Sequence, residues 1–68
     1  GGKVQVVNQK DGYNEDEIRQ VFAKIHPNQT ILKATLGFYN KHIVWEIVSK
    51  QNQYYFFDFK SGQAIENI

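Results

Sequence analysis

The strongest constraint on the fold comes from two strand-like segments, residues 43–48 and 54–59, which flank the polar stretch Lys50-Gln51-Asn52. Side chains alternate between the faces of a strand, so a pairing register is credible only if the large apolar residues of both strands share one face. A three-residue loop meets this condition, with Asn52 in the left-handed conformation that such a loop requires. It places Ile47 opposite Tyr55, Trp45 opposite Phe57 and Ile43 opposite Phe59.

The same parity extends the sheet on both sides. A two-residue turn at Asn40-Lys41 joins a preceding strand, and a three-residue loop at 60–62, with Gly62 left-handed, joins a last short strand. The expected pairs are Phe38 with Ile43, Leu36 with Trp45, Ala34 with Ile47 and Phe57 with Ile65, and Leu32 continues the inner face. Residues 30–65 therefore predict a four-stranded antiparallel meander with one apolar face.

A short amphipathic helix precedes the predicted sheet. Asn14 and Glu17 stand three residues apart, which is the spacing of a capping box, and acidic residues in the first turn suit the positive end of the helix dipole. Pro27 ends the helix, because the residue before a proline is pushed out of helical geometry. The apolar stripe at helical spacing consists of Ile18, Val21, Phe22 and Ile25.

The expected fold is a two-layer α+β domain, in which one N-terminal helix packs on a four-stranded antiparallel meander sheet. The helical stripe is the obvious cover for the apolar face of the sheet. We therefore expect Trp45 to be buried between Leu36, Phe57 and the helix. With 68 residues and 41% hydrophobic content, the chain is one domain of a size at which a single core is only marginally sufficient.

Two parts of the chain are distinguished. Residues 14–68 form the expected α+β domain, and residues 1–13 form an N-terminal strand or linker, in which Lys3–Val7 has strand-like content and suggests a short extra strand. The chain starts with Gly1-Gly2 instead of methionine, which indicates either an expression remnant or an internal cut from a longer protein, and an anchor or signal is expected upstream. A contact with a membrane is expected only through such a segment outside this chain, because no apolar run here is long enough to span a bilayer.

No catalytic, metal or cofactor constellation emerges from the residues. The net charge of +1 does not suit a nucleic-acid partner, and the lysines at the predicted turns, Lys41, Lys50 and Lys60, form no stripe. The chain has no cysteine, so it has neither a disulfide framework nor a thiolate site. His26 and His42 are isolated from other ligand residues, and Asp58 beside a turn is expected to accept hydrogen bonds from backbone amides. We therefore predict no enzymatic activity, no metal and no cofactor.

A family resemblance adds a functional class. The closing segment Tyr55-Phe56-Phe57-Asp58-Phe59-Lys60-Ser61-Gly62-Gln63-Ala64-Ile65 resembles the aromatic strand and Asp-x-x-Thr-Gly turn of the PepSY family, and Val44-Trp45-Glu46-Ile47 resembles an earlier strand of that family. The resemblance covers residues 14–65. Ser61 stands where the family usually has threonine, and Phe59 stands where a small residue is common, so the subgroup stays open.

The resemblance implies a non-enzymatic, extracytoplasmic bacterial domain of the cell envelope or of a secreted protein, with a membrane-anchored parent protein. Such domains occur in propeptides of metalloproteases, so the expected function is protein binding, either to regulate a peptidase or to pair with a neighbouring domain or a second copy. Two alternatives stay open at this point: a purely structural domain of an envelope protein, and a binder of small ligands.

The candidate protein-binding face lies on the side of the sheet away from the helix. In the predicted register this face carries Val44, Val48, Tyr54 and Phe56. A sheet covered on one side normally shows polar residues on its other side, whereas this one shows a partly apolar strip. Exposed apolar strips with polar surroundings commonly mark interfaces, although aromatic and β-branched residues also suit strands without any partner.

Overall fold

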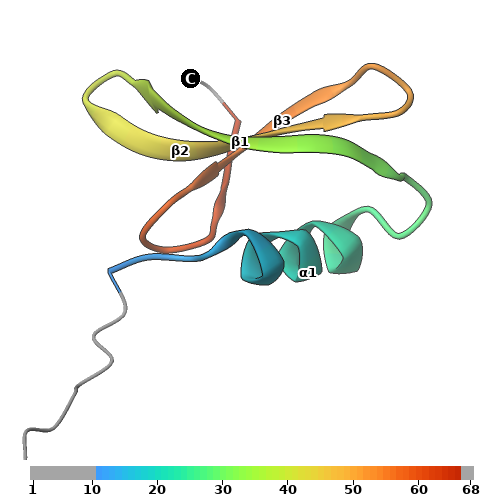
Figure 1. The fold of residues 1–68 in the computed structure, drawn as a ribbon, viewed down its shortest axis with the longest axis horizontal. Coiled ribbons are helices and arrows are strands. Elements are labelled where there is room, and N and C mark those ends of the chain that lie inside the picture. The colour runs from blue at the N-terminus through green and yellow to red at the C-terminus, as the bar shows by residue number, and fades with distance from the viewer. Residues whose placement is uncertain (1–10, 67–68) are drawn as a thin grey trace, which may run out of the picture.

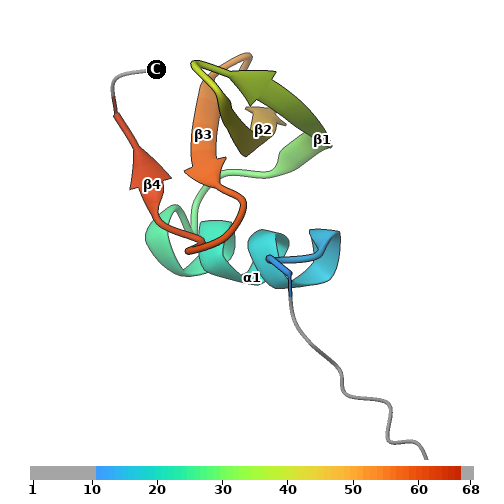
Figure 2. The ribbon, with the colours of Figure 1, turned by 90° about the vertical axis from the view of Figure 1, so that its left-hand side faces the viewer.

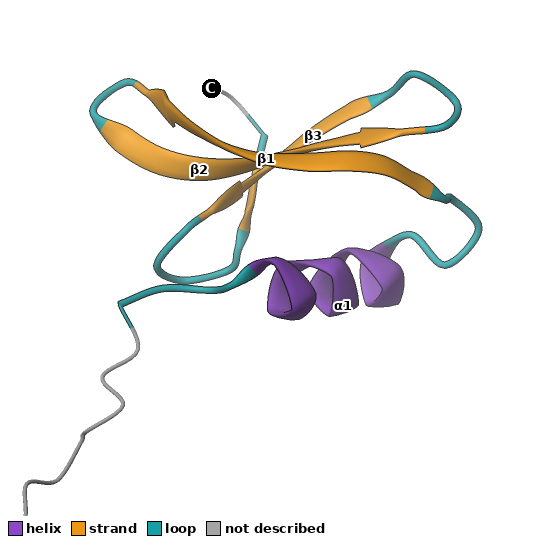
Figure 3. Ribbon diagram, in the orientation of Figure 1, coloured by secondary structure: helices purple, strands orange, loops and turns teal. Residues whose placement is uncertain are grey.

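The computed structural model describes residues 11–66, which form one helix and one four-stranded antiparallel sheet (Figure 1). The elements in chain order are α1 (Glu15–Ile25), β1 (Ile31–Tyr39), β2 (His42–Ser49), β3 (Tyr54–Asp58) and β4 (Ala64–Ile65). Neighbouring strands follow the chain order, and α1 covers one face of the sheet (Figures 2 and 3). The predicted two-layer α+β fold is thus confirmed, while the strand suggested at Lys3–Val7 lies outside the described residues.

Helix α1 is capped as its sequence predicts. The Glu17 amide donates to Asn14 Oδ1 at 2.8 Å, and the Asn14 amide donates to Glu17 Oε1 at 2.9 Å. This reciprocal pair satisfies amides that have no partner inside the helix. At the other end, the His26 amide donates to the Phe22 carbonyl at 2.7 Å, and Pro27 follows.

The first two hairpins have the predicted turns and registers. Asn40 and Lys41 both have positive φ, at 50° and 67°, as a two-residue turn of the primed type requires, and Asn52 has φ of 65° in the three-residue loop. The observed pairs include Phe38 with Ile43, Leu36 with Trp45, Ala34 with Ile47, Trp45 with Phe57, and Ile47 with Tyr55. Turn chemistry and side-chain parity therefore fix the register of β1, β2 and β3.

The expected inner position of Leu32 is wrong. The register of β1 against β2 shifts between Ile31 and Lys33, which is the irregularity that a β-bulge produces. Because one extra residue reverses the alternation of side chains, Ile31 packs against the core and Leu32 is 56% exposed. Regular pairing in β1 thus begins at Lys33.

The last hairpin also differs from its predicted register. Phe57 pairs with Ala64 and not with Ile65, and the Asp58 amide donates to the Gln63 carbonyl at 2.8 Å, which leaves four loop residues instead of three. Gly62 is left-handed as expected, with φ of 73°. Ile65 consequently pairs with Phe56 and belongs to the face away from α1.

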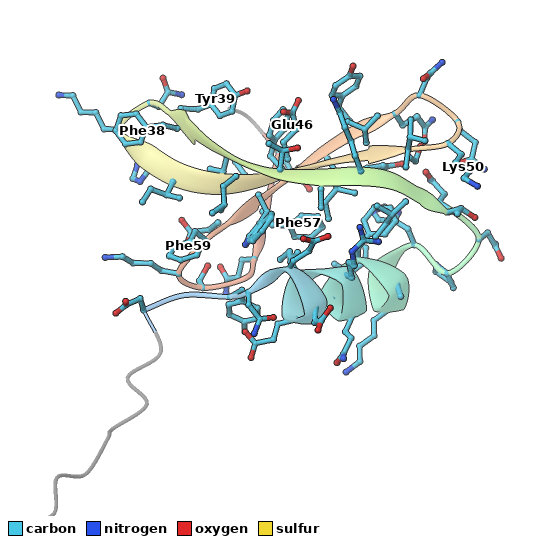
Figure 4. The ribbon with its side chains drawn as sticks, in the orientation of Figure 1. Phe38, Tyr39, Glu46, Lys50, Phe57 and Phe59 are labelled. Atoms are coloured by element: carbon cyan, nitrogen blue, oxygen red, sulfur yellow. The ribbon has the colours of Figure 1, made fainter. Side chains whose placement is uncertain are left out.

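The core lies between α1 and the sheet. Its buried members are Ile18, Phe22, Trp45, Ile47 and Phe57. The rings of Phe22 and Phe57 meet edge to face with centroids 6.3 Å apart, a favourable aromatic arrangement, and Figure 4 shows Phe57 between the sheet and α1.

The segment just before α1 completes this core. The Tyr13 amide donates to the Phe59 carbonyl at 2.8 Å, and Trp45 Nε1 donates to the Tyr13 carbonyl at 2.8 Å. A Cβ atom at Gly62 would lie 2.5 Å from the Tyr13 ring, so the glycine allows this ring to pack against the turn between β3 and β4. One backbone residue thus joins α1 to both β2 and the last turn.

The burial expected for Trp45 is confirmed, but that expected for Leu36 is wrong. Trp45 is 7% exposed, whereas Leu36, directly opposite in β1, is 48% exposed. The 11 residues of α1 span about 16 Å, while the nine residues of β1 span about 30 Å. A helix of this length covers only part of the inner face.

We expect Trp45→Ala to lower the free energy of unfolding by about 3 to 5 kcal/mol, because it removes a buried ring and its bond to the Tyr13 carbonyl. Urea unfolding followed by circular dichroism measures the change. Leu36→Ala serves as the matched control, since Leu36 faces the same side of the sheet but is half exposed, and it should cost much less. Equal losses in the two variants would contradict the described packing.

Candidate protein-binding surface

The predicted binding residues do share the sheet face away from α1, as their pairing shows. Val48 pairs with Tyr54, and Glu46 pairs with Phe56. However, Val44 is 0% and Val48 is 3% exposed. The expectation that these two valines offer an accessible binding strip is therefore wrong, because a partner cannot reach them in the folded domain.

Two aromatic rings help to cover Val44. Tyr39 in β1 and Phe56 in β3 meet edge to face with ring centroids 5.6 Å apart. Gly37 lies under the Tyr39 ring, since a Cβ atom there would lie 2.9 Å from Tyr39 Cε2, and Gly37 is the direct partner of Val44. The two rings therefore meet over the central strand β2, and Figure 4 shows Tyr39 on the side away from α1.

The remaining two predicted residues differ from each other. Tyr54 is 61% exposed, whereas Phe56 is partly buried and its ring contacts that of Tyr39. A binding role for Tyr54 and Phe56 stays a prediction.

A different apolar surface is exposed on the β1–β2 hairpin, on the same face as Trp45. Its members are Leu36, Phe38 and Ile43, which are 48%, 69% and 45% exposed, and which we call the hairpin patch. Figure 4 shows Phe38 near the hairpin turn, to one side of α1. A hollow of about 240 Å³ adjoins the patch and is lined by Phe38, Lys41, His42, Ile43, Asp58 and Lys60. The patch thus has an apolar centre and a charged border.

The hairpin patch adjoins an open sheet edge. Strand β1 forms one edge of the sheet and β4 forms the other, and among residues 11–66 β1 pairs only with β2. Tyr39 and His42 flank the two-residue turn and form a hydrogen-bonded pair, and such pairs recur at every second residue. The N–H and C=O groups of Ala34, Leu36 and Phe38 therefore point outward from the sheet.

Two of the titratable residues, His26 and Asp58, have local structural partners. The His26 ring packs against the rings of Phe22 and Tyr55, with centroids 4.9 and 4.4 Å away. Asp58 Oδ2 accepts hydrogen bonds from the amides of Ser61 at 2.8 Å and Lys60 at 3.0 Å, which confirms its predicted turn role. Within residues 11–66, no three histidine, cysteine or acidic residues come close enough together to hold a metal ion.

The Asp58 carboxylate is stabilised in its charged form. The hydrogen bond from the Ser61 amide is the largest cause that lowers the pKa of Asp58 from its ordinary value of 3.8, and the Ser61 hydroxyl and the Lys60 amide act in the same direction. Burial opposes this shift. The charged carboxylate thus holds the last turn through its hydrogen bonds to the Ser61 and Lys60 amides.

A second concavity lies between the end of α1 and the last hairpin. This groove has a volume of about 470 Å³ and is lined by Ile25, His26, Tyr54, Tyr55, Phe56, Phe57, Ala64, Ile65 and Glu66. Its walls are mainly aromatic and aliphatic.

Comparison with protein-family models, curated proteins and solved structures gave no match for this chain. The PepSY resemblance therefore stays an expectation based on residues 14–65. In the part of the chain that the structure describes, no helix is both long enough and apolar enough to cross a bilayer.

Sequence reasoning missed the hairpin patch because parity alone reports which residues share a face. It does not report how much of that face the helix covers. The available signal was length, since an 11-residue helix cannot cover a nine-residue strand from end to end.

We expect the stability contributed by Asp58 to depend on pH. Because folding lowers the pKa of Asp58, this contribution is present above the ordinary value of 3.8 and is lost as the pH falls through the folded-state pKa. The difference in unfolding free energy between the parent and Asp58→Asn should therefore shrink as the pH falls below 3.8. A difference that stays constant from neutral to acidic pH would show that the charge of Asp58 contributes nothing.

Val48→Lys and Tyr54→Lys form a matched pair, because these residues face each other across β2 and β3. A lysine at Val48, which is 3% exposed, should cost about 3 kcal/mol or more, since it removes a buried side chain and introduces a charge. A lysine at Tyr54, which is 61% exposed, should change stability by no more than about 1 kcal/mol. Denaturant unfolding of both variants measures this contrast, and equal stabilities would mean that Val48 is accessible.

Proposed function

We propose that this chain is a non-enzymatic protein-binding module, and that it acts on the extracytoplasmic side of a bacterial cell, as part of an envelope or secreted protein. The observation that carries the proposal is the hairpin patch of Leu36, Phe38 and Ile43 beside the open edge of β1. Exposed apolar patches with polar borders commonly mark protein interfaces. The cellular location rests on the PepSY resemblance alone.

The geometry supports binding by strand addition. An extended partner segment that pairs with β1 would accept and donate hydrogen bonds at Ala34, Leu36 and Phe38, whose backbone groups point outward. Alternate side chains of that segment would lie over the hairpin patch. The backbone bonds would then supply affinity, and the patch would select apolar side chains at every second position.

A regulatory role towards a peptidase is one form of this function. An extended segment of the peptidase would pair with β1, and the module would hold the peptidase through this segment without cleaving it. The PepSY resemblance supports this class of partner, and the structural turn role of Asp58 supports a module without its own catalysis.

A small-ligand binder is the second candidate, because the aromatic groove between α1 and the last hairpin has about 470 Å³. That volume falls within the range typical of ligand pockets. The groove and the hairpin patch share no residue. A substitution at Tyr54, which lines the groove, can therefore test this candidate separately from the first.

The test is selection of peptides from a random display library, followed by titration of isotope-labelled protein with a selected peptide. We expect the largest amide shift changes at Ala34, Leu36 and Phe38, and we expect Phe38→Lys to abolish binding. Tyr54→Lys is the control, because it places the same charge at another exposed aromatic position and should bind like the parent.

Two results would contradict the proposal. Recovery of no binding peptide would count against a protein-binding module. Shift changes confined to the groove residues around Tyr54 and Ala64 would favour the small-ligand candidate instead.

A further inference from the structure

We infer that β1 pairs with β1 of a second copy of this chain, antiparallel about a two-fold axis at Leu36. The inference rests on the proposed function and names its partner. An antiparallel strand pair is its own symmetric counterpart, so one exposed edge can serve both copies of a dimer. Two four-stranded sheets would join into one continuous sheet.

The position of the axis follows from the bulge. Regular pairing in β1 starts at Lys33 and ends at Tyr39, because the register shifts between Ile31 and Lys33. Leu36 is the midpoint of residues 33–39. Its outward N–H and C=O can exchange both hydrogen bonds with Leu36 of the second copy, as opposed residues of a hydrogen-bonded antiparallel pair do.

This register matches side-chain sizes on both faces. On the patch face it sets Leu36 opposite Leu36 and the large Phe38 opposite the small Ala34. On the other face it sets Gly37 opposite Thr35. Every residue from 34 to 38 then has a sterically compatible partner, and the exposed rings of both Phe38 residues lie over alanine positions.

The charges are also compatible with self-pairing. Lys33 is the single charged residue of β1, and the register sets it opposite Tyr39 of the second copy. The two lysines are therefore six residues apart along the joined edge, which is about 20 Å. This separation exceeds the screening length of about 8 Å at physiological salt, so the lysines do not repel strongly. The chain's net charge of +1 adds little repulsion.

The composition of β1 also supports a pairing partner for this strand. Edge strands commonly carry several charges or a proline that prevent pairing with other chains. The regular part of β1, residues 33–39, carries Lys33 at one end and no proline. The bulge at its start limits pairing to these residues and so favours one register.

The interface is small, because seven residues pair in each copy. Stable complexes bury roughly 1,200 to 2,000 Å², and weak or transient complexes bury less. We therefore expect a reversible dimer whose population depends on protein concentration.

Sedimentation equilibrium over a wide range of concentrations tests the association. The mean mass should rise from 7.9 kDa towards twice that value. Phe38→Lys should weaken the dimer by about tenfold or more, since it places a charge at the most exposed residue of the patch. Leu36→Pro removes the central outward N–H, at a position where an edge strand tolerates proline, and should also weaken it. Tyr54→Lys should associate like the parent.

Single cysteines test the register, because the chain contains none of its own. Opposed Cα atoms of a hydrogen-bonded pair lie about 5.5 Å apart, within the range that a disulfide spans. Leu36→Cys should therefore form a cross-linked dimer rapidly under mild oxidation. Thr35→Cys is the matched control. Thr35 is the exposed neighbour of Leu36 in the sequence, but in the proposed register it lies opposite Gly37 of the second copy and not opposite Thr35.

The outcomes separate this inference from the proposed function. A monomer at every concentration, or faster cross-linking through Thr35→Cys, overturns the dimer or its register. If the monomer still binds selected peptides along β1, the proposed function stands and the second copy is not the partner. If Phe38→Lys and Tyr54→Lys weaken association equally, the dimer does not form through β1.

Discussion

The mismatch in length between α1 and the sheet is the constraint on which the rest of the structure depends. The helix has 11 residues and rises about 16 Å, while β1 extends about 30 Å. Ile18 and Phe22 therefore reach Trp45, Ile47 and Phe57, and within residues 11–66 no helix lies over the hairpin end of the inner face. The same apolar side-chain pattern produces a buried core at one end and an exposed surface at the other.

On the opposite face of the sheet, side chains from the strands themselves cover Val44. Tyr39 lies over Gly37 and meets Phe56, and Val44 beneath them is fully buried. The core under α1 thus stabilises one face of the sheet, and the contact between Tyr39 and Phe56 stabilises the other. A second protein can therefore reach the hairpin patch, whereas Val44 and Val48 on the opposite face are buried.

Much of the fold could be predicted from the sequence, because turn chemistry and parity act locally. Asn40-Lys41 and Asn52 define two turns, and the alternation of large residues then fixes the pairs from Phe38 and Ile43 to Ile47 and Tyr55. The errors arose at two places where one extra residue in a strand or loop shifts the pairing register. A bulge beside Leu32 and a fourth loop residue before Gln63 each shift the parity, and neither has a distinctive residue signature.

The candidate site was harder to predict, because exposure depends on how elements cover one another. Val44 and Val48 were assigned correctly to the face away from α1, yet both are buried, and the two rings that meet over Val44 come from β1 and β3. Residue-resolved hydrogen exchange by mass spectrometry at low protein concentration tests the central claim most directly. We predict rapid exchange of the Leu36 amide and slow exchange of the Gly37 amide, because only the second bonds to β2. Equal protection of the two amides would show that another segment covers the β1 edge.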